Sequence, residues 1–178
     1  MSLRRFAAAA MLSLMLGTLG LAVHAEGAAS GGKKLSSEER LQRLEDLESI
    51  RGLLVSYGRT FDARKFVDYG NLFAKEGTWT GGAEATTTYK GPAAITAFVQ
   101  KIYPATVFPG SYHIMSNFDI KLDGKDSASS WSRWTFVVNG VHNEPVIFRG
   151  GWYEDTFTRE DGEWKFKTRF VLTDPPPK

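Results

Sequence analysis

The sequence predicts one α+β domain, in which three helices of the N-terminal half pack on one face of a curved, mixed but mainly antiparallel sheet. Two observations lead to this prediction. Apolar residues recur every three or four positions up to Phe73, and mostly every second position afterwards. Helices followed by a series of hairpin-connected strands are typical of the α+β class. With 178 residues and no internal repeat, the chain is long enough for one domain with its own core.

The first helix is expected to begin after Ser36, because Ser36 and Glu39 have the spacing of a capping box. Behind this start, apolar residues at steps of three and four form one continuous stripe: Leu41, Leu44, Leu47, Ile50, Leu54, Tyr57 and Phe61. Gly52 and Gly58 each lower the stability of such a helix by roughly 1 kcal/mol. We interpret these two glycines as marks of the close approach of another element.

The remaining elements follow in chain order. A short second helix is expected over residues 64–72, and Pro92 opens a third helix that ends near Ile102, since proline is tolerated at a first helical position. Asp123-Gly124 is a turn signal between two long strands. The expected strands cover residues 78–80, 86–89, 111–122, 127–139, 146–158 and 164–172.

The N-terminal segment has the three-part layout of a secretory signal. Arg4 and Arg5 precede an apolar run, and compact residues occupy Val23 and Ala25, the two positions that a signal peptidase reads. We therefore expect cleavage after Ala25 and export to the periplasm or the extracellular space, with no membrane anchor left on the protein. The cleavage would remove two positive charges and no negative ones, which leaves a formal net charge of zero.

The sequence after the signal divides into three parts. Residues 26–35 are expected to form a flexible leader, residues 36–174 the folded domain, and residues 175–178 a proline-rich tail. A neutral domain does not favour a nucleic-acid partner.

Several kinds of site are excluded by the composition. The chain has no cysteine, which excludes disulfides, cysteine-ligated metals and thiol nucleophiles. Outside the signal, His113 and His142 are the only histidines, and two histidines in separate segments do not supply a three-histidine metal site. We therefore expect neither a metal nor a cofactor.

Three stretches of the chain carry a resemblance to a known family. They are Tyr57–Asp62 with Phe73 downstream, residues 113–124, and residues 151–166. These stretches resemble the SnoaL-like branch of the nuclear transport factor 2-like superfamily over roughly residues 40–173. The resemblance implies a cone-shaped fold with a pocket for a hydrophobic small molecule. It leaves the chemistry open, because the superfamily contains enzymes and binding modules alike.

The resemblance also implies a set of site residues. Dehydratases of this family line the pocket with a tyrosine and an aspartate near the end of the first helix and a histidine on a central strand, which match Tyr57, Asp62 and His113. In such a set, the aspartate holds the histidine in one tautomer, the histidine moves a proton, and the tyrosine donates a hydrogen bond. The residues expected to bind substrate are Trp79, Asn117, Phe118, Trp131 and Arg133.

Strand periodicity sets a condition on His113. Phe118, Ile120 and Leu122 share one face of their strand, and His113 lies an odd number of residues from each of them. In a regular strand, His113 would therefore point away from the core. A β-bulge near Ser116–Asn117 would return it to the interior.

Two functions stay open at this point. The first is an exported lyase, such as a dehydratase, or an isomerase that acts without a cofactor on a hydrophobic, carbonyl-bearing molecule through an Asp62–His113 acid/base pair. The second is a non-catalytic module that holds an apolar ligand or dimerises through the outer face of the sheet. Each catalytic candidate has a structural alternative: Tyr57 as a core residue, Asp62 as a partner of Arg64, and His113 as a satisfied core histidine.

Overall fold

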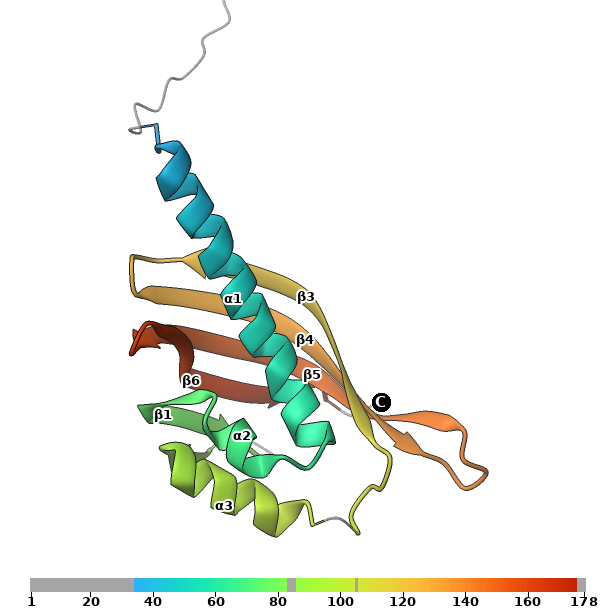
Figure 1. Cartoon of the computed structure of the whole chain (residues 1–178). Coiled ribbons are helices and arrows are strands. Elements are labelled where there is room, and N and C mark those ends of the chain that lie inside the picture. Colours follow the sequence, from blue (N-terminus) through green and yellow to red (C-terminus); the bar gives the residue numbers. More distant parts are fainter. Residues whose placement is uncertain (1–33, 83–85, 105, 176–178) are drawn as a thin grey trace, which may run out of the picture. The chain divides into compact units, whose positions relative to one another are not determined.

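Three helices lie on one face of a six-stranded sheet in the computed structural model, which describes residues 34–82, 86–104 and 106–175 (Figure 1). The expected signal at residues 1–25 lies outside the described residues, as do most of the expected leader and the end of the tail. Within the described part of the chain, no helix has the length and apolar character needed to span a membrane.

The sheet has the strand order β2-β1-β6-β5-β4-β3. Of the pairings among the described strands, β1 with β6 is parallel and the others are antiparallel, which confirms the mixed, mainly antiparallel sheet. Figure 1 shows the long strands curving round the helices. The strands are β1 (Phe73–Gly81), β2 (Thr87–Lys90), β3 (Tyr112–Leu122), β4 (Ser127–Asn139), β5 (Pro145–Glu160) and β6 (Glu163–Thr173).

The helices are α1 (Ser37–Asp62), α2 (Phe66–Gly70) and α3 (Pro92–Ile102). The predicted capping box is present: the Glu39 backbone N–H donates to Ser36 Oγ at 3.1 Å, and the Ser36 N–H donates to a Glu39 carboxylate oxygen at 2.6 Å. Helix α2 is shorter than expected, because Arg64 has φ +57°, a left-handed conformation that a right-handed helix excludes.

The apolar stripe of α1 is buried only in its C-terminal part. Ile50, Leu54 and Phe61 lie in the core, whereas Leu41 and Leu44 are 57% and 64% exposed. Figure 1 shows the reason, since the first turns of α1 extend past the edge of the sheet. The spacing of the stripe therefore predicts the helix correctly but not how much of it is covered.

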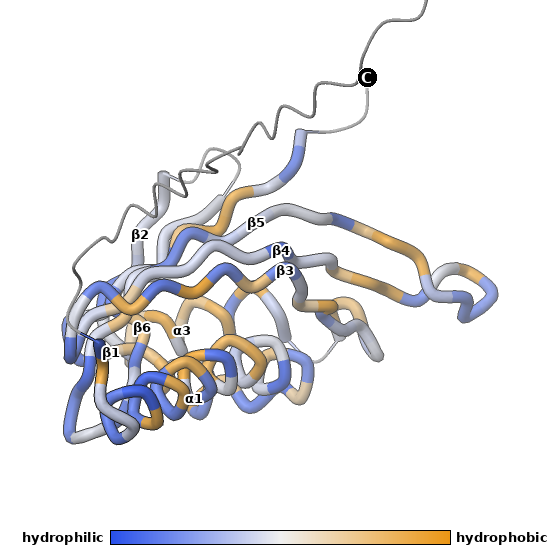
Figure 2. The backbone as a smooth tube through the Cα atoms, turned by 90° about the horizontal axis from the view of Figure 1, so that it is seen from above, coloured by the Kyte–Doolittle hydropathy of each residue, from blue (hydrophilic) through white to orange (hydrophobic). Residues whose placement is uncertain are grey.

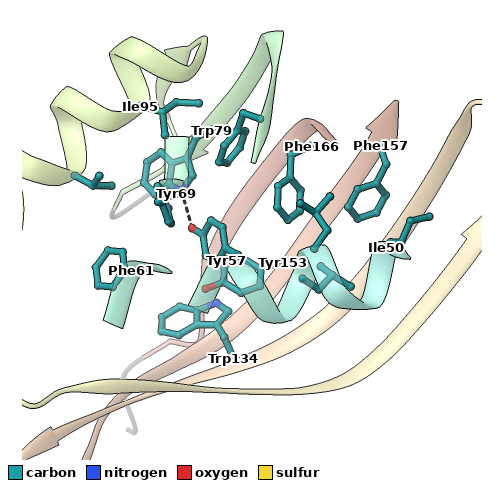
Figure 3. Packing of buried hydrophobic residues seen from close by; sticks show 14 of the residues in the cluster. Ile50, Tyr57, Phe61, Tyr69, Trp79, Ile95, Trp134, Tyr153, Phe157 and Phe166 are labelled. Atoms are coloured by element: carbon teal, nitrogen blue, oxygen red, sulfur yellow. Dashed lines mark hydrogen bonds between the residues drawn. The ribbon is translucent and has the colours of Figure 1, made fainter. Parts of the chain in front are cut away.

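Aromatic rings form most of the core on the concave face of the sheet (Figure 3). Tyr57 of α1 lies at their centre, with its ring centroid 4.7 Å from that of Tyr69 and 5.5 Å from that of Tyr153. Tyr57 also contacts the rings of Phe73 and Phe166. The helix stripe and the inward residues of the strands thus meet in one cluster.

The hairpin formed by β4 and β5 extends beyond the rest of the sheet, and Figure 2 shows hydrophobic stretches along it. Ile147 on this hairpin is 71% exposed. Phe148, the next residue, turns the other way and contacts the rings of Phe108 and Phe136. The base of the hairpin therefore contributes to the interior of the domain.

Candidate functional site: an aromatic cavity with an aspartate–histidine pair

A cavity of about 280 Å³ opens between the helices and the concave face of the sheet. Its walls are mostly aromatic and aliphatic, with a few polar groups, which is the usual character of a small-molecule site. Every helix and five of the six strands contribute to it. The lining residues are Tyr57, Phe61, Tyr69, Trp79, Phe98, Val99, Ile102, Tyr103, Phe108, His113, Trp134, Phe136, Phe148, Arg149, Tyr153 and Val171.

Asp62 holds His113, which lines this cavity, although Asp62 is not itself one of the lining residues. One Asp62 oxygen accepts a hydrogen bond from the His113 backbone N–H at 2.9 Å, and the other lies 2.7 Å from His113 Nδ1. The side chain of Asp62 is 21% exposed and that of His113 is 10% exposed. An ionised carboxylate in this position accepts the Nδ1 proton and so fixes the tautomer. Nε2 then carries the lone pair, and no described residue hydrogen-bonds to it.

Gly58 lies where α1 and β3 approach each other closely, beside this pair. A Cβ built on Gly58 would lie 3.4 Å from His113 Cβ and 3.5 Å from Met115 Cγ. Any longer side chain on this face of α1 would therefore push β3 away from Asp62. The interpretation of Gly58 as a contact glycine is confirmed, whereas that of Gly52 is wrong, because nothing lies within 4 Å of its built Cβ.

A β-bulge turns His113 toward the cavity. Ser116 pairs with Arg133 and Asp119 pairs with Trp131, so three steps along β3 match two steps along β4. Asn117 lies at the extra position with φ +54°. The predicted bulge is confirmed, and it allows His113 and Phe118 to face the same interior although an odd number of residues separates them.

Tyr57 is both a core residue and part of the cavity wall. Its hydroxyl accepts a hydrogen bond from Trp79 Nε1 at 2.9 Å, drawn as the dashed line in Figure 3. Because this bond uses the oxygen as an acceptor, the Tyr57 proton is left to donate. Trp79 therefore acts as an orienting partner of the phenol, a role that its donor-only N–H suits.

Arg64 does not pair with Asp62. Its Nη2 donates to the carbonyl oxygens of Val107 and Phe108 at 2.8 and 3.0 Å. These two residues belong to the loop that follows α3, and Phe108 lines the cavity. Arg64 thus holds part of the cavity wall, and Asp62 is left to bind His113.

A buried ion pair lies under the Tyr57 ring. The Asp155 carboxylate accepts two hydrogen bonds from Arg169, both at 2.7 Å, and both side chains are fully buried. The guanidinium carbon of Arg169 lies 3.9 Å from the centroid of Tyr57 and 4.0 Å from that of Tyr153. Burial raises the pKa of Asp155, and the positive charge of Arg169 opposes that rise.

Of the five expected substrate-binding residues, the structure places Trp79 in the cavity wall. Phe118 packs against the core without lining the cavity, and Asn117 is exposed at the bulge. Trp131 and Arg133 alternate along β4 with the buried Ser132 and Trp134, so they lie on the outer face of the sheet.

The contacts on that outer face show what these two residues do. Trp131 is 38% exposed. Arg133 forms two hydrogen bonds to Asp174, at 3.1 and 2.5 Å. Neither residue lines this cavity, because strand alternation turns both away from it.

Sequence reasoning missed three charged residues: Arg149, an exposed residue that lines the cavity, and the buried pair Asp155–Arg169. The alternation of Tyr153, Asp155 and Phe157 along one strand was an available signal, since it puts the aspartate on the buried face. Among the described residues, no group of three or more His, Asp or Glu side chains is arranged to hold a metal ion.

A curved sheet that encloses an apolar cavity with helices on its concave side defines a protein of the nuclear transport factor 2-like fold. Within that class, the chain belongs to the SnoaL-like domain family, whose model matches residues 42–170. This assignment confirms the family that the sequence motifs indicated.

The relatives of the chain agree with this assignment. An uncharacterized protein of Mycobacterium tuberculosis is 29% identical over 140 residues, which are 76% of this chain and 87% of the relative. A nuclear transport factor 2-like protein from Novosphingobium aromaticivorans has a similar structure, with a TM-score of 0.68 and 26% identity, covering 77% of this chain and 88% of that one. The hexachlorocyclohexane dehydrochlorinase LinA-type3 from Novosphingobium barchaimii gives a TM-score of 0.65 at 22% identity, covering 76% and 91%.

Proposed function

We propose that this protein is a cofactor-independent lyase or isomerase that removes a proton from carbon in a hydrophobic, carbonyl-bearing small molecule. The observation that carries the proposal is the position of His113 in the wall of an aromatic cavity, with its Nδ1 held by Asp62. A histidine held by a carboxylate at Nδ1 acts as a general base through Nε2. An apolar wall around the base excludes water from the reacting atoms.

The residues suggest a simple sequence of steps. His113 Nε2 takes a proton from the carbon next to the substrate carbonyl, and the C–H electron pair moves toward the carbonyl oxygen as an enolate. The Tyr57 hydroxyl donates a hydrogen bond to that oxygen as negative charge develops on it. In an elimination, the enolate then re-forms the carbonyl and a C=C bond as the bond from the adjacent carbon to the leaving group breaks, and the imidazolium of His113, stabilised by Asp62, protonates that group. In an isomerisation, the imidazolium protonates another carbon of the enolate system instead.

The relatives support the proposal only in general terms. One structural relative is named as a dehydrochlorinase, and dehydrochlorination is an elimination. At 22% identity the likeness shows the fold, so the proposed reaction rests on the pair of residues in this chain. A non-catalytic ligand-binding module would use the same cavity, but it would have no need for a histidine oriented in this way.

We also propose that the protein acts outside the cytoplasm. The arginines at positions 4 and 5, the apolar run behind them and the compact residues before position 26 support export. Mass measurement of the protein secreted by its own host would test this, with a mature N-terminus at Glu26 as the expected result and an intact residue 1 as the contrary one.

The catalytic proposal is tested with 5-nitrobenzisoxazole, a small aromatic probe that reports general bases. Removal of its ring C–H proton breaks the N–O bond and releases a coloured nitrophenolate, so one absorbance measurement follows the elimination. We expect His113→Gln to lower the rate by about 100-fold or more, since a positioned general base contributes at least that much. The matched control is His142→Gln, because His142 is exposed on the β4–β5 hairpin.

Circular dichroism and thermal unfolding should be the same for the parent and both variants. Equal rates in the parent and His113→Gln would refute the proposed base. Tight binding of the probe without any elimination in the parent would instead identify a ligand-binding module.

A further inference from the structure

We infer that Arg149 selects the ligand, and that the cavity accepts hydrophobic molecules carrying one anionic oxygen group such as a carboxylate. The inference rests on the proposed function for the role of His113, and it adds the substrate class. Arg149 lines the same cavity as His113, and no sequence motif marked it.

Strand register places the cation and the base in one row. His113 on β3 pairs with Phe136 on β4, and Phe136 pairs with Arg149 on β5. Residues directly opposite each other in antiparallel strands point to the same face, and all three line the cavity. Two strand spacings separate the backbones of His113 and Arg149, which is about 10 Å. A small cyclic molecule over Phe136 would reach both side chains.

The guanidinium of Arg149 has no carboxylate or carbonyl partner among the residues that the structure describes. The other arginines on the described strands are paired: Arg133 with Asp174, Arg159 with Asp46, and Arg169 with Asp155. The backbone N–H of Asp174 donates to the carbonyl oxygen of Gly150, the residue after Arg149. The Asp174 carboxylate, however, accepts its hydrogen bonds from Arg133 and not from Arg149. The positive charge of Arg149 is therefore available to a ligand.

The charge of Arg149 is placed to contact a polar group at one end of a ligand, and not the apolar part of the ligand inside the cavity. Arg149 is an exposed residue in a wall of largely buried aromatic rings, so it lies where the cavity meets solvent. Its guanidinium carbon is 5.8 Å from the ring of Phe148. Burial, and to a lesser extent the neighbouring Tyr57, raise the pKa of Tyr103 in the same wall, and the positive charges of Arg149 and Arg64 oppose that rise.

These features together describe an amphipathic anion. The aromatic walls favour a flat or cyclic apolar body, and a guanidinium at the mouth binds a carboxylate through two parallel N–H···O bonds. A neutral ligand of the same shape would fill the cavity without using Arg149.

The test compares two probes of almost the same shape, 2-naphthoate and the neutral 2-naphthamide. Their affinities are measured by calorimetry at neutral pH for the parent, Arg149→Gln and Arg40→Gln. The last variant removes the same charge from the exposed start of α1 and is the matched control. We expect the parent and control to bind naphthoate about tenfold more tightly than the amide, a difference of about 1.4 kcal/mol. In Arg149→Gln this preference should vanish while the affinity for the amide stays the same.

Equal affinities of the parent for both probes would overturn the inference, as would a preference that persists in Arg149→Gln. The alternative is that His113, and not Arg149, binds the carboxylate of naphthoate. In that case the preference for naphthoate would be lost in His113→Gln and kept in Arg149→Gln. The binding measurement does not require turnover. If the protein is inactive but still prefers naphthoate, the proposed reaction is refuted and the inferred selectivity stands.

Discussion

The carboxylate of Asp62 binds His113 at two points, the backbone N–H at 2.9 Å and the ring Nδ1 at 2.7 Å. One contact fixes the position of β3 against the end of α1, and the other fixes the rotation and tautomer of the imidazole. The local structure and the proposed chemistry therefore depend on the same carboxylate. Gly58, one helical turn earlier, allows the close approach that the two contacts need.

Asp62→Asn should separate these two effects. The asparagine oxygen can still accept from the His113 backbone, but its NH₂ group donates toward Nδ1 and so favours the tautomer with the proton on Nε2. We expect elimination of 5-nitrobenzisoxazole to fall by about 100-fold or more, because Nε2 no longer serves as a base. Nitrogen NMR of the imidazole reports the tautomer. An unchanged rate with an unchanged tautomer would contradict the assigned role of Asp62.

Asn117 should be sensitive to β-branched residues. Its φ of +54° is a left-handed conformation that asparagine and glycine tolerate and valine does not. We expect Asn117→Val to lower the free energy of unfolding by about 1–2 kcal/mol, and Asn117→Gly to change it little. Urea unfolding measures both.

Deletion of Asn117 is a stricter test of the same bulge. Without the extra residue, the strand would alternate regularly, and His113 or Phe118 would have to leave the interior. Loss of probe elimination in a protein that still folds is the expected result. Retained elimination would mean that another residue can take the extra position.

Much of the fold could be predicted from the sequence, since periodicity and turn signals depend on local residues. The bulge could also be predicted, because His113 and Phe118 have opposite parity on one strand. The orientation of β4 could not, because aromatic residues occur on both of its faces, Trp131 on one and Trp134 on the other. Arg149 likewise became part of a site only through its register with Phe136, and register between strands is not a local property.

Removal of only one partner of the ion pair between Asp155 and Arg169 should strongly destabilise the fold. Arg169→Met leaves an unpaired carboxylate in the core, and we expect the free energy of unfolding at neutral pH to fall by about 3–5 kcal/mol. The double variant Asp155→Leu/Arg169→Met removes both charges and should be more stable than the single one. Urea unfolding measures the free energy of unfolding of both variants. If the double variant were less stable than the single one, the uncompensated charge of Asp155 would not be the cause of the destabilisation.

The same single variant should recover on acidification. Burial raises the pKa of Asp155 even in the parent, and the loss of Arg169 removes the main opposing effect. A carboxyl group whose pKa is higher in the folded state favours folding at low pH, and that contribution is lost as the pH rises through the folded pKa. The deficit of Arg169→Met should therefore be smaller near pH 5 than at neutral pH. A deficit independent of pH would point to lost packing instead.

Asp46 should show the opposite dependence on pH. It accepts hydrogen bonds from Arg159 at 2.5 Å and from Trp164 Nε1 at 3.2 Å, which tie α1 to the β5–β6 hairpin. A third hydrogen bond, at 3.2 Å, comes from Gln42 of α1 itself. Burial by itself would raise the pKa of Asp46, but these hydrogen bonds and the charge of Arg159 outweigh it and lower the pKa. The ionised carboxylate therefore stabilises the fold above its ordinary pKa, and this contribution is lost as the pH falls through the lowered value.

We accordingly expect Asp46→Asn to lower the free energy of unfolding at neutral pH by about 1.5–3 kcal/mol, the range for hydrogen bonds to a charged group. Below the lowered pKa the parent carboxyl is itself neutral, so the difference between the two proteins should shrink as the pH falls below the ordinary pKa of an aspartate. Urea unfolding across this range measures the difference. Asp119→Asn is the control, because Asp119 pairs with Lys121 on the surface with 63% of its side chain exposed, and such pairs contribute little. A deficit of Asp46→Asn that stays constant down to the lowest pH would show that side-chain geometry, and not the charge, holds α1 in place.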